Sequence, residues 1–79
     1  MAVEVEFTVE PFLEGSPGAH VDAALEAVRS EGLEIEVGPF GSSFVGGTEQ
    51  AARTIDRIVA DAIGAGATRI SVQVTVVDP

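Results

Sequence analysis

The amino-acid sequence predicts an α+β sandwich in which two helices cover one face of a four-stranded antiparallel sheet. Four segments alternate apolar and polar residues with a period of two, as strands with one buried face do. Two further segments repeat apolar residues at the period of about 3.6 residues that marks a helix. The order is strand, helix, strand, strand, helix, strand, and right-handed crossovers place both helices on one face. This is the split βαβ, or ferredoxin-like, fold, with strand order 4-1-3-2.

The four strands are predicted from alternation and from the turn residues that bound them. Ala2 to Glu10 is the clearest, because valines and a phenylalanine alternate with glutamates and a threonine. Leu33 to Val37 and Ser42 to Val45 form a hairpin around Gly38 to Gly41, a segment dense in turn residues. Arg69 to Val77 is the last strand. Four of its side chains are expected to face the helices: Ile70, Val72, Val74 and Val76.

The two helices are predicted from capping residues and apolar stripes. Ser16 and Pro17 are typical of an N-cap and a first helical residue, and Gly32 is a natural stop for this helix. Thr48 is predicted to cap the second helix, which ends in the Gly64 to Gly66 run. The stripes expected to be buried are Val21, Ala24, Leu25 and Val28 in the first helix, and Ala52, Ile55, Ile58, Val59, Ala62 and Ile63 in the second.

The length, the composition and the net charge of the chain restrict the class of protein. A chain of 79 residues is expected to form one domain, residues 1–79, with a marginal core, because a chain this short buries only about 60% of its unfolded surface. It has no cysteine for a disulfide, so oligomerisation is the expected source of further stability. A formal charge of −9 disfavours nucleic acids and anionic membranes as partners. No apolar run approaches the ~20 residues of a membrane span, and no signal sequence is apparent, so a cytoplasmic protein is expected.

One face of the predicted sheet carries no helix, and this open face is acidic. Five of its ten residues are glutamates, and like charges on neighbouring strands destabilise a sheet. Solvent, a cationic ligand or an arginine from another subunit should offset that repulsion. A merely solvated acidic face is the plain alternative, and the pattern alone favours it. The ten residues are Glu4, Glu6, Thr8, Glu10, Glu34, Glu36, Ser43, Val45, Gln73 and Thr75.

The residue types give little support to catalysis. The chain has one histidine and no cysteine, and its serine pair has no visible base or nucleophile elbow. A small enzyme that uses Glu6, Glu10 or His20 is a minor hypothesis, but it suggests no substrate, and His20 is expected on the surface. Metal ligation by strand glutamates would lack a histidine and a defined cage. We therefore expect neither a metal nor a cofactor.

A further indication comes from the hairpin and its flanks. The run Glu36 to Pro39 is followed by two hydroxyl residues and then Gly46, and it comes after a helix end at Ser30 to Leu33. With the Gly66 to Arg69 run, these residues resemble the YkoF-type thiamine-binding protein family, over roughly Val5 to Val77. The resemblance implies a small, non-catalytic, cytoplasmic protein of ferredoxin-like fold. Such a protein would form a homodimer or homotetramer and bind thiamine or its hydroxymethylpyrimidine part.

The match to this family is residue by residue, with two departures. The chain has Ile35 where the family often has a tyrosine, and Val45 where it often has a glutamate. Phe40 and Phe44 are the aromatic side chains near the hairpin that could stack on a pyrimidine. The matching positions are Gly38 and Pro39 for the turn, Ser42 and Ser43 for the family's threonine or serine pair, and Gly46 for the closing glycine.

The open face suits a ligand of the thiamine type. Thiamine carries a permanent thiazolium charge and a hydrogen-bonding aminopyrimidine, and carboxylates edged by hydroxyls can accept both. Two sheets could also meet at this face, with a ligand between subunits. The leading hypothesis is a non-enzymatic binding protein, and the alternative is a structural or regulatory oligomerisation module without a small ligand. The predicted ligand-binding residues are Glu6, Thr8, Glu36, Gly38, Pro39, Phe40, Ser42 and Ser43.

Overall fold

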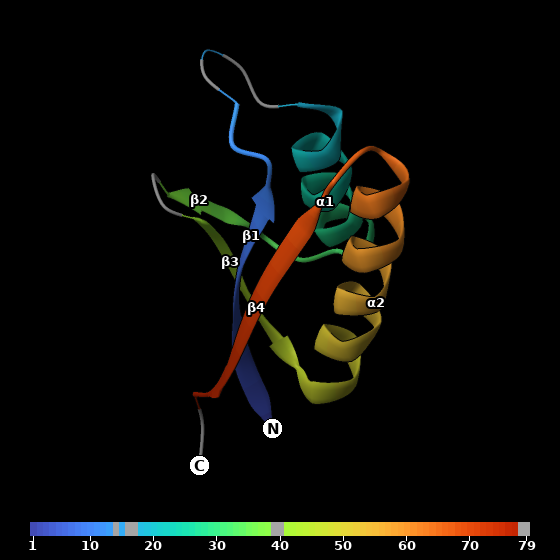
Figure 1. Ribbon diagram of the computed structural model, residues 1–79. Coiled ribbons are helices and arrows are strands. Elements are labelled where there is room, and N and C mark those ends of the chain that lie inside the picture. Colours follow the sequence, from blue (N-terminus) through green and yellow to red (C-terminus); the bar gives the residue numbers. More distant parts are fainter. Residues whose placement is uncertain (14, 16–17, 39–40, 78–79) are drawn as a thin grey trace.

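The computed structural model describes residues 1–13, 15, 18–38 and 41–77. These residues form two helices, three long strands and one short strand (Figure 1). The sheet is antiparallel with order β2-β3-β1-β4, and both helices lie on one of its faces. The ferredoxin-like fold and the strand order 4-1-3-2 are thus confirmed. The elements are β1 (Ala2–Glu10), α1 (Ala19–Ser30), β2 (Glu36–Gly38), β3 (Gly41–Gly47), α2 (Thr48–Gly64) and β4 (Arg69–Val76).

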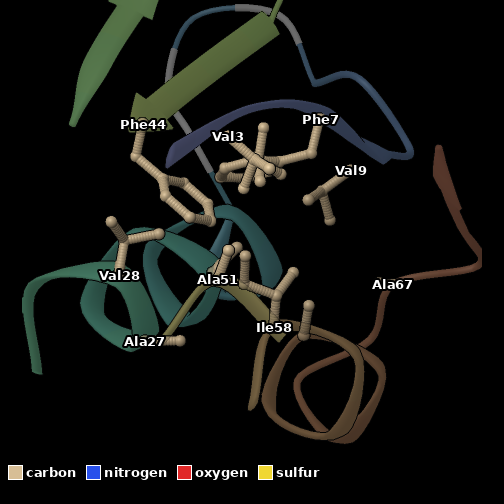
Figure 2. Close-up of a cluster of buried hydrophobic side chains, with 12 residues drawn as sticks. Val3, Phe7, Val9, Ala27, Val28, Phe44, Ala51, Ile58 and Ala67 are labelled. Atoms are coloured by element: carbon tan, nitrogen blue, oxygen red, sulfur yellow. The ribbon is translucent and has the colours of Figure 1, made fainter. Parts of the chain in front are cut away.

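The core fills the space between the helices and the two central strands. Val5 of β1, Val28 of α1 and Ile58 of α2 are fully buried. Phe7 and Phe44 come from neighbouring strands and meet edge to face, with ring centroids 6.2 Å apart. Figure 2 shows Phe44, Val28 and Ile58 pointing into this common space. The buried face of β1 is therefore the one predicted from its alternation.

The strand predicted over residues 33–37 is shorter than expected. Gly32 adopts a φ of +77°, and the N–H of Leu33 donates to the carbonyl of Val28, which closes the end of α1. This helix-ending turn takes up Leu33, so that β2 begins only at Glu36. Leu33 and Ile35 pack against the core from the connecting segment, whereas Val37 is exposed.

His20 is buried, so its predicted place on the surface is wrong. It lies in the first turn of α1, and its Nε2 is 2.7 Å from the carbonyl oxygen of Pro11. A Cβ on Gly18 would stand 2.5 Å from the imidazole, so the N-cap residue must be small for the ring to fit. The predicted helix start at Ser16 and Pro17 lies outside the described residues. The buried residues of α1 are His20, Ala24, Ala27 and Val28.

The apolar stripe of α2 is rotated relative to the predicted one. Ala52, Val59 and Ile63 were expected in the core but are exposed, because the helix turns Thr54 inward instead. The Thr54 hydroxyl donates to the carbonyl of Gln50 at 2.8 Å, which satisfies this buried polar group. The buried residues of α2 are Ala51, Thr54, Ile58 and Ala62.

The start of α2 also differs from the prediction. Gly47 is the N-cap residue, and Thr48 is the first residue of the helix rather than its cap. The Thr48 hydroxyl donates instead to the carbonyl of Met1, 3.2 Å away. This bond ties the beginning of α2 to the beginning of β1.

The valines of β4 face the helix side of the sheet, as their alternation predicts, but they are not buried there. Val72 is opposite Phe7 and Val74 is opposite Val5, so these valines share the face of the core residues. The helices pack on β1 and β3, and β4 is the outermost strand on its side. The prediction that Val72, Val74 and Val76 are covered is therefore wrong, because the helix layer stops short of this edge.

Candidate ligand-binding site

A hollow of about 510 Å³ crosses the sheet, and all four strands contribute to its lining. Its volume falls within the range of about 300–1,000 Å³ that is typical of small-molecule sites. Most of its polar residues belong to the open face, opposite the helices. Two neighbouring rows of residues on that face give the hollow its shape and its chemistry.

The first row carries the functional groups. Glu6 is opposite Gln73 on β4 and opposite Ser43 on β3, and Ser43 is in turn opposite Glu36 on β2. Neighbouring strands lie about 4.8 Å apart, so the two carboxylate-bearing strands are separated by about 10 Å with the serine between them. The row therefore presents an amide, a carboxylate, a hydroxyl and a second carboxylate in sequence across the sheet.

The second row consists of small residues. Thr8 is opposite Ser71, and Gly38 is opposite Gly41. A Cβ on Gly41 would lie 3.1 Å from the carbonyl oxygen of Phe7 and 3.2 Å from Cγ2 of Thr8. The missing side chain at Gly41 thus lets β3 lie close to β1 and leaves the surface low there. The hollow arises where this low row meets the row of glutamates.

Six of the eight residues predicted to bind a ligand line this hollow: Glu6, Thr8, Glu36, Gly38, Ser42 and Ser43. Ser42 is opposite Phe7 on β1, so it belongs to the helix side of the sheet, between the two rows. Pro39 and Phe40 lie outside the described residues. Phe44 is buried in the core, so the idea that it stacks on a ligand at the open face is wrong.

The sequence reasoning missed the other six residues of the lining: Phe7, Val37, Gly41, Ser71, Val72 and Gln73. Alternation along the last strand did place Ser71 and Gln73 outward, and the strand order placed that strand beside β1. The missing information was the register, because a strand order does not say which residues are opposite one another. Gly41 was interpreted as a turn residue only.

The hollow is electrostatically negative. Arg69 pairs with Glu10 at 3.6 Å at the end of the sheet, which offsets one of the five open-face glutamates within the chain itself. Arg53 and Arg57 pair with Glu31, far from the open face. Within the described part of the chain, no arginine pairs with Glu6 or Glu36. Their charges are therefore available to attract a small cation.

Other kinds of site receive no support from the geometry. The residues that the structure describes include no group of three or more histidine, cysteine, aspartate or glutamate side chains placed to hold a metal ion. The imidazole of His20 is buried, and its Nε2 is engaged with the carbonyl oxygen of Pro11. Across the described ranges, no helix has the length and apolar character needed to cross a membrane.

The fold and the hollow together define a small ferredoxin-like protein with an acidic, ligand-sized depression on its helix-free sheet face. The model of one family, described as thiamine-binding protein, matches residues 5–78. The chain belongs to this thiamine-binding protein family. No match was found among the curated proteins.

Solved structures from several organisms share the fold. A Thermotoga maritima protein, provisionally described as acting in thiamine biosynthesis or salvage, is 26% identical, with a TM-score of 0.70 over 95% of this chain and 81% of that one. A domain of unknown function from Bacillus cereus is 24% identical, with a TM-score of 0.69 over 94% of this chain and 72% of that one. A Streptococcus pneumoniae protein is 18% identical, with a TM-score of 0.79 over 99% of this chain and 89% of that one.

Proposed function

We propose that this protein binds thiamine, or a related hydroxymethylpyrimidine cation, in the acidic hollow without catalysing a reaction on it. The observation that carries the proposal is the row in which Glu6 and Glu36 flank Ser43 at the edge of a low, small-residue surface. Membership of the thiamine-binding protein family supports a ligand of the thiamine type. The residues proposed to contact it include Glu6, Thr8, Glu36, Gly38, Ser42 and Ser43. Ser71 and Gln73 are added because the pairing of β4 with β1 places them opposite Thr8 and Glu6.

The chemistry of the row fits the two parts of such a ligand. A thiazolium cation gains Coulomb energy beside a carboxylate, and an aminopyrimidine can donate to a carboxylate and accept from a hydroxyl or an amide. A second hollow of about 350 Å³ adjoins the first and shares Glu36 and Ser43 with it. Two adjoining hollows that share one carboxylate suit a ligand with two linked rings.

The proposal is for binding alone. A catalytic site would need a nucleophile or a general acid–base group held near the ligand. The serine of the row has carboxylate neighbours but no histidine, and the family is one of binding proteins. The family resemblance also supports a homo-oligomer in the cytoplasm.

Calorimetric titration with thiamine at low and at moderate salt tests the proposal. We expect binding that weakens as salt rises, because ions screen the attraction between the cation and the exposed carboxylates. Glu6→Gln and Glu36→Gln should each weaken binding about tenfold, which corresponds to the loss of one charge-assisted contact of about 1.4 kcal/mol. Glu26→Gln, an exposed glutamate of α1, is the matched control and should bind as the wild type does.

Two outcomes would count against the proposal. One is the absence of heat and of any thermal shift at millimolar thiamine. The other is binding that both Glu6→Gln and Glu36→Gln retain unchanged, because the ligand would then lie elsewhere. A negative result for thiamine and for hydroxymethylpyrimidine would favour the alternative, an assembly module that binds nothing small.

A further inference from the structure

Glu31, the residue that caps the end of α1, is held by two arginines of α2. Its Oε1 lies 3.5 Å from Nε of Arg53, and its Oε2 lies 3.6 Å from Nη1 of Arg57. The Glu31 side chain is 18% exposed, whereas the side chains of Arg53 and Arg57 are 62% and 46% exposed. Both carboxylate oxygens of Glu31 are therefore engaged, and two of the four arginines of the chain pair with this one acidic residue.

The backbone of Glu31 is held by the same helix. The side-chain amide of Gln50 donates from its Nε2 to the Glu31 carbonyl at 3.0 Å. Gln50, Arg53 and Arg57 are spaced by three and four residues, so they lie on one face of α2. We call the contacts of these three residues with Glu31 the Glu31 clamp. The two helices lie side by side (Figure 1), and the clamp fixes the point at which the chain leaves α1.

β3 lies against the clamp at a residue that has no side chain. A Cβ on Gly46 would stand 3.3 Å from Cδ2 of Leu33 and 3.4 Å from Oε1 of Gln50. Gly46 therefore leaves room for Gln50 to reach Glu31 and lets Leu33 pack against the strand. The end of α1, the start of α2 and β3 thus meet at one junction.

The segment that leaves this junction forms part of the ligand-binding region. Gly32, Leu33 and Glu34 line the second hollow, and Glu36 lines both hollows. Glu36 follows Glu31 by five residues and begins β2, the short outermost strand. The clamp is therefore joined to one of the two carboxylates of the site by a short stretch of chain.

The two carboxylates of the site are supported differently. Glu6 lies on β1, which is paired with β3 on one side and with β4 on the other. Glu36 lies on a strand that is paired on one side only, with three residues of β3. The position of Glu36 therefore depends also on where the chain leaves α1, whereas the position of Glu6 does not.

We propose that Glu31 is a positioning residue for ligand binding, and that the clamp holds Glu36 at the distance from Glu6 that the ligand requires. The inference rests on the proposed function, because it concerns the same hollow. Glu31 lines neither hollow, so it acts through the segment that leads to Glu36. Ion pairs between partly exposed side chains contribute little to stability, so the main effect of the clamp is on the geometry of the site.

A double-mutant cycle on the calorimetric affinity for thiamine tests the proposal. Glu31→Ala should weaken binding about fivefold and Glu36→Gln about tenfold. The variant with both changes should lose only about tenfold, because a residue that acts through Glu36 has no effect once the Glu36 charge is absent. Glu31→Ala with Glu6→Gln is the matched control, and its two losses should multiply to about fiftyfold.

Amide chemical shifts of the protein without ligand give a second readout. Glu31→Gln keeps the shape of the side chain and removes its charge. It should move the amide signals of Glu34 to Glu36 and leave those of β1 in place. Far-ultraviolet circular dichroism checks that each variant is folded, and Glu31→Gln replaces Glu31→Ala in the cycle if the alanine variant does not fold.

The outcomes separate this inference from the proposed function. Thiamine binding that Glu31→Ala leaves unchanged overturns the inference alone. So do losses that multiply for Glu31→Ala and Glu36→Gln as they do for the Glu6→Gln control, or shifts in Glu31→Gln that are absent from Glu34 to Glu36. A wild type that does not bind thiamine overturns the proposed function, and the inference with it.

Discussion

At Gly41, the absence of a side chain has a local reason and a functional consequence. The backbone of β3 lies so close to β1 there that a Cβ would stand 3.1 Å from a carbonyl oxygen of its neighbour. The same absence gives the hollow its low surface beside Thr8 and Gly38. A turn glycine inferred from the sequence is thus also a residue that shapes the site.

Substitution of Gly41 by valine tests this role. The side chain would occupy the low row and push against Thr8, so we expect thiamine binding to weaken at least tenfold. Unfolding by urea should show a loss of about 1–3 kcal/mol, the usual range for overpacking. Gly47→Ala on the same strand is the control, because nothing lies within 4 Å of its added Cβ, and it should leave binding unchanged. Unaltered affinity of the valine variant would place the ligand elsewhere.

His20 shows what residue patterns cannot reveal. Its position off the apolar stripe indicated a surface histidine, and the minor enzyme hypothesis named it as an alternative to Glu6 and Glu10. The structure instead places its Nε2 2.7 Å from the carbonyl of Pro11, nine residues earlier in the chain. This partner belongs to a loop whose path no periodicity describes. The side chain is therefore part of the packing of α1 against that loop.

At the scale of the elements, the order and the buried faces of the long strands could be predicted, and the helix faces only in part. Alternation depends on the backbone itself, so it placed Glu6, Ser43 and Gln73 on one side of the sheet. The apolar stripe of α2 was broader than the part that is covered, and Val59 is as apolar as the buried Ile58. Periodicity predicts how wide the apolar face of a helix is. Which part of that face is buried depends on the area that the sheet and the other helix cover.

The length of β2 was mispredicted for a related reason. Leu33 to Val37 alternates as a strand does, but Gly32 ends α1 with a turn whose backbone hydrogen bonds include Leu33. Leu33 therefore belongs to the turn that ends α1 and not to the strand. The remaining short strand brings Glu36 opposite Ser43, which the site requires.

The turn at the end of α1 provides a prediction at this scale. Gly32 has a φ of +77°, a conformation that disfavours any side chain, although space for one is available. Gly32→Ala should lower the free energy of unfolding by about 1–2 kcal/mol. Gly64→Ala, at the end of α2, is the control, because its φ is not positive and its surroundings are open. Equal stability of the two variants in urea would contradict the assigned role of the turn.

The whole molecule combines an acidic open face with an apolar edge. The open face holds the hollow and the carboxylates of Glu6 and Glu36, and the edge of β4 carries exposed valines. The hollow reaches this edge, because Val72 lines the hollow and is also one of the exposed valines of β4.

The central claim is that the row of Glu6, Ser43 and Glu36 receives a thiamine-type cation, and its most direct test is an amide chemical-shift titration. On addition of thiamine, the shifts should concentrate at Glu6 to Thr8, at Ser43 and at Gln73, and the amides on the outer surface of α2 should stay in place. Saturation should be lost when Glu6 and Glu36 are both replaced by glutamine. Shifts confined to the helices, or none at millimolar thiamine, would contradict the claim.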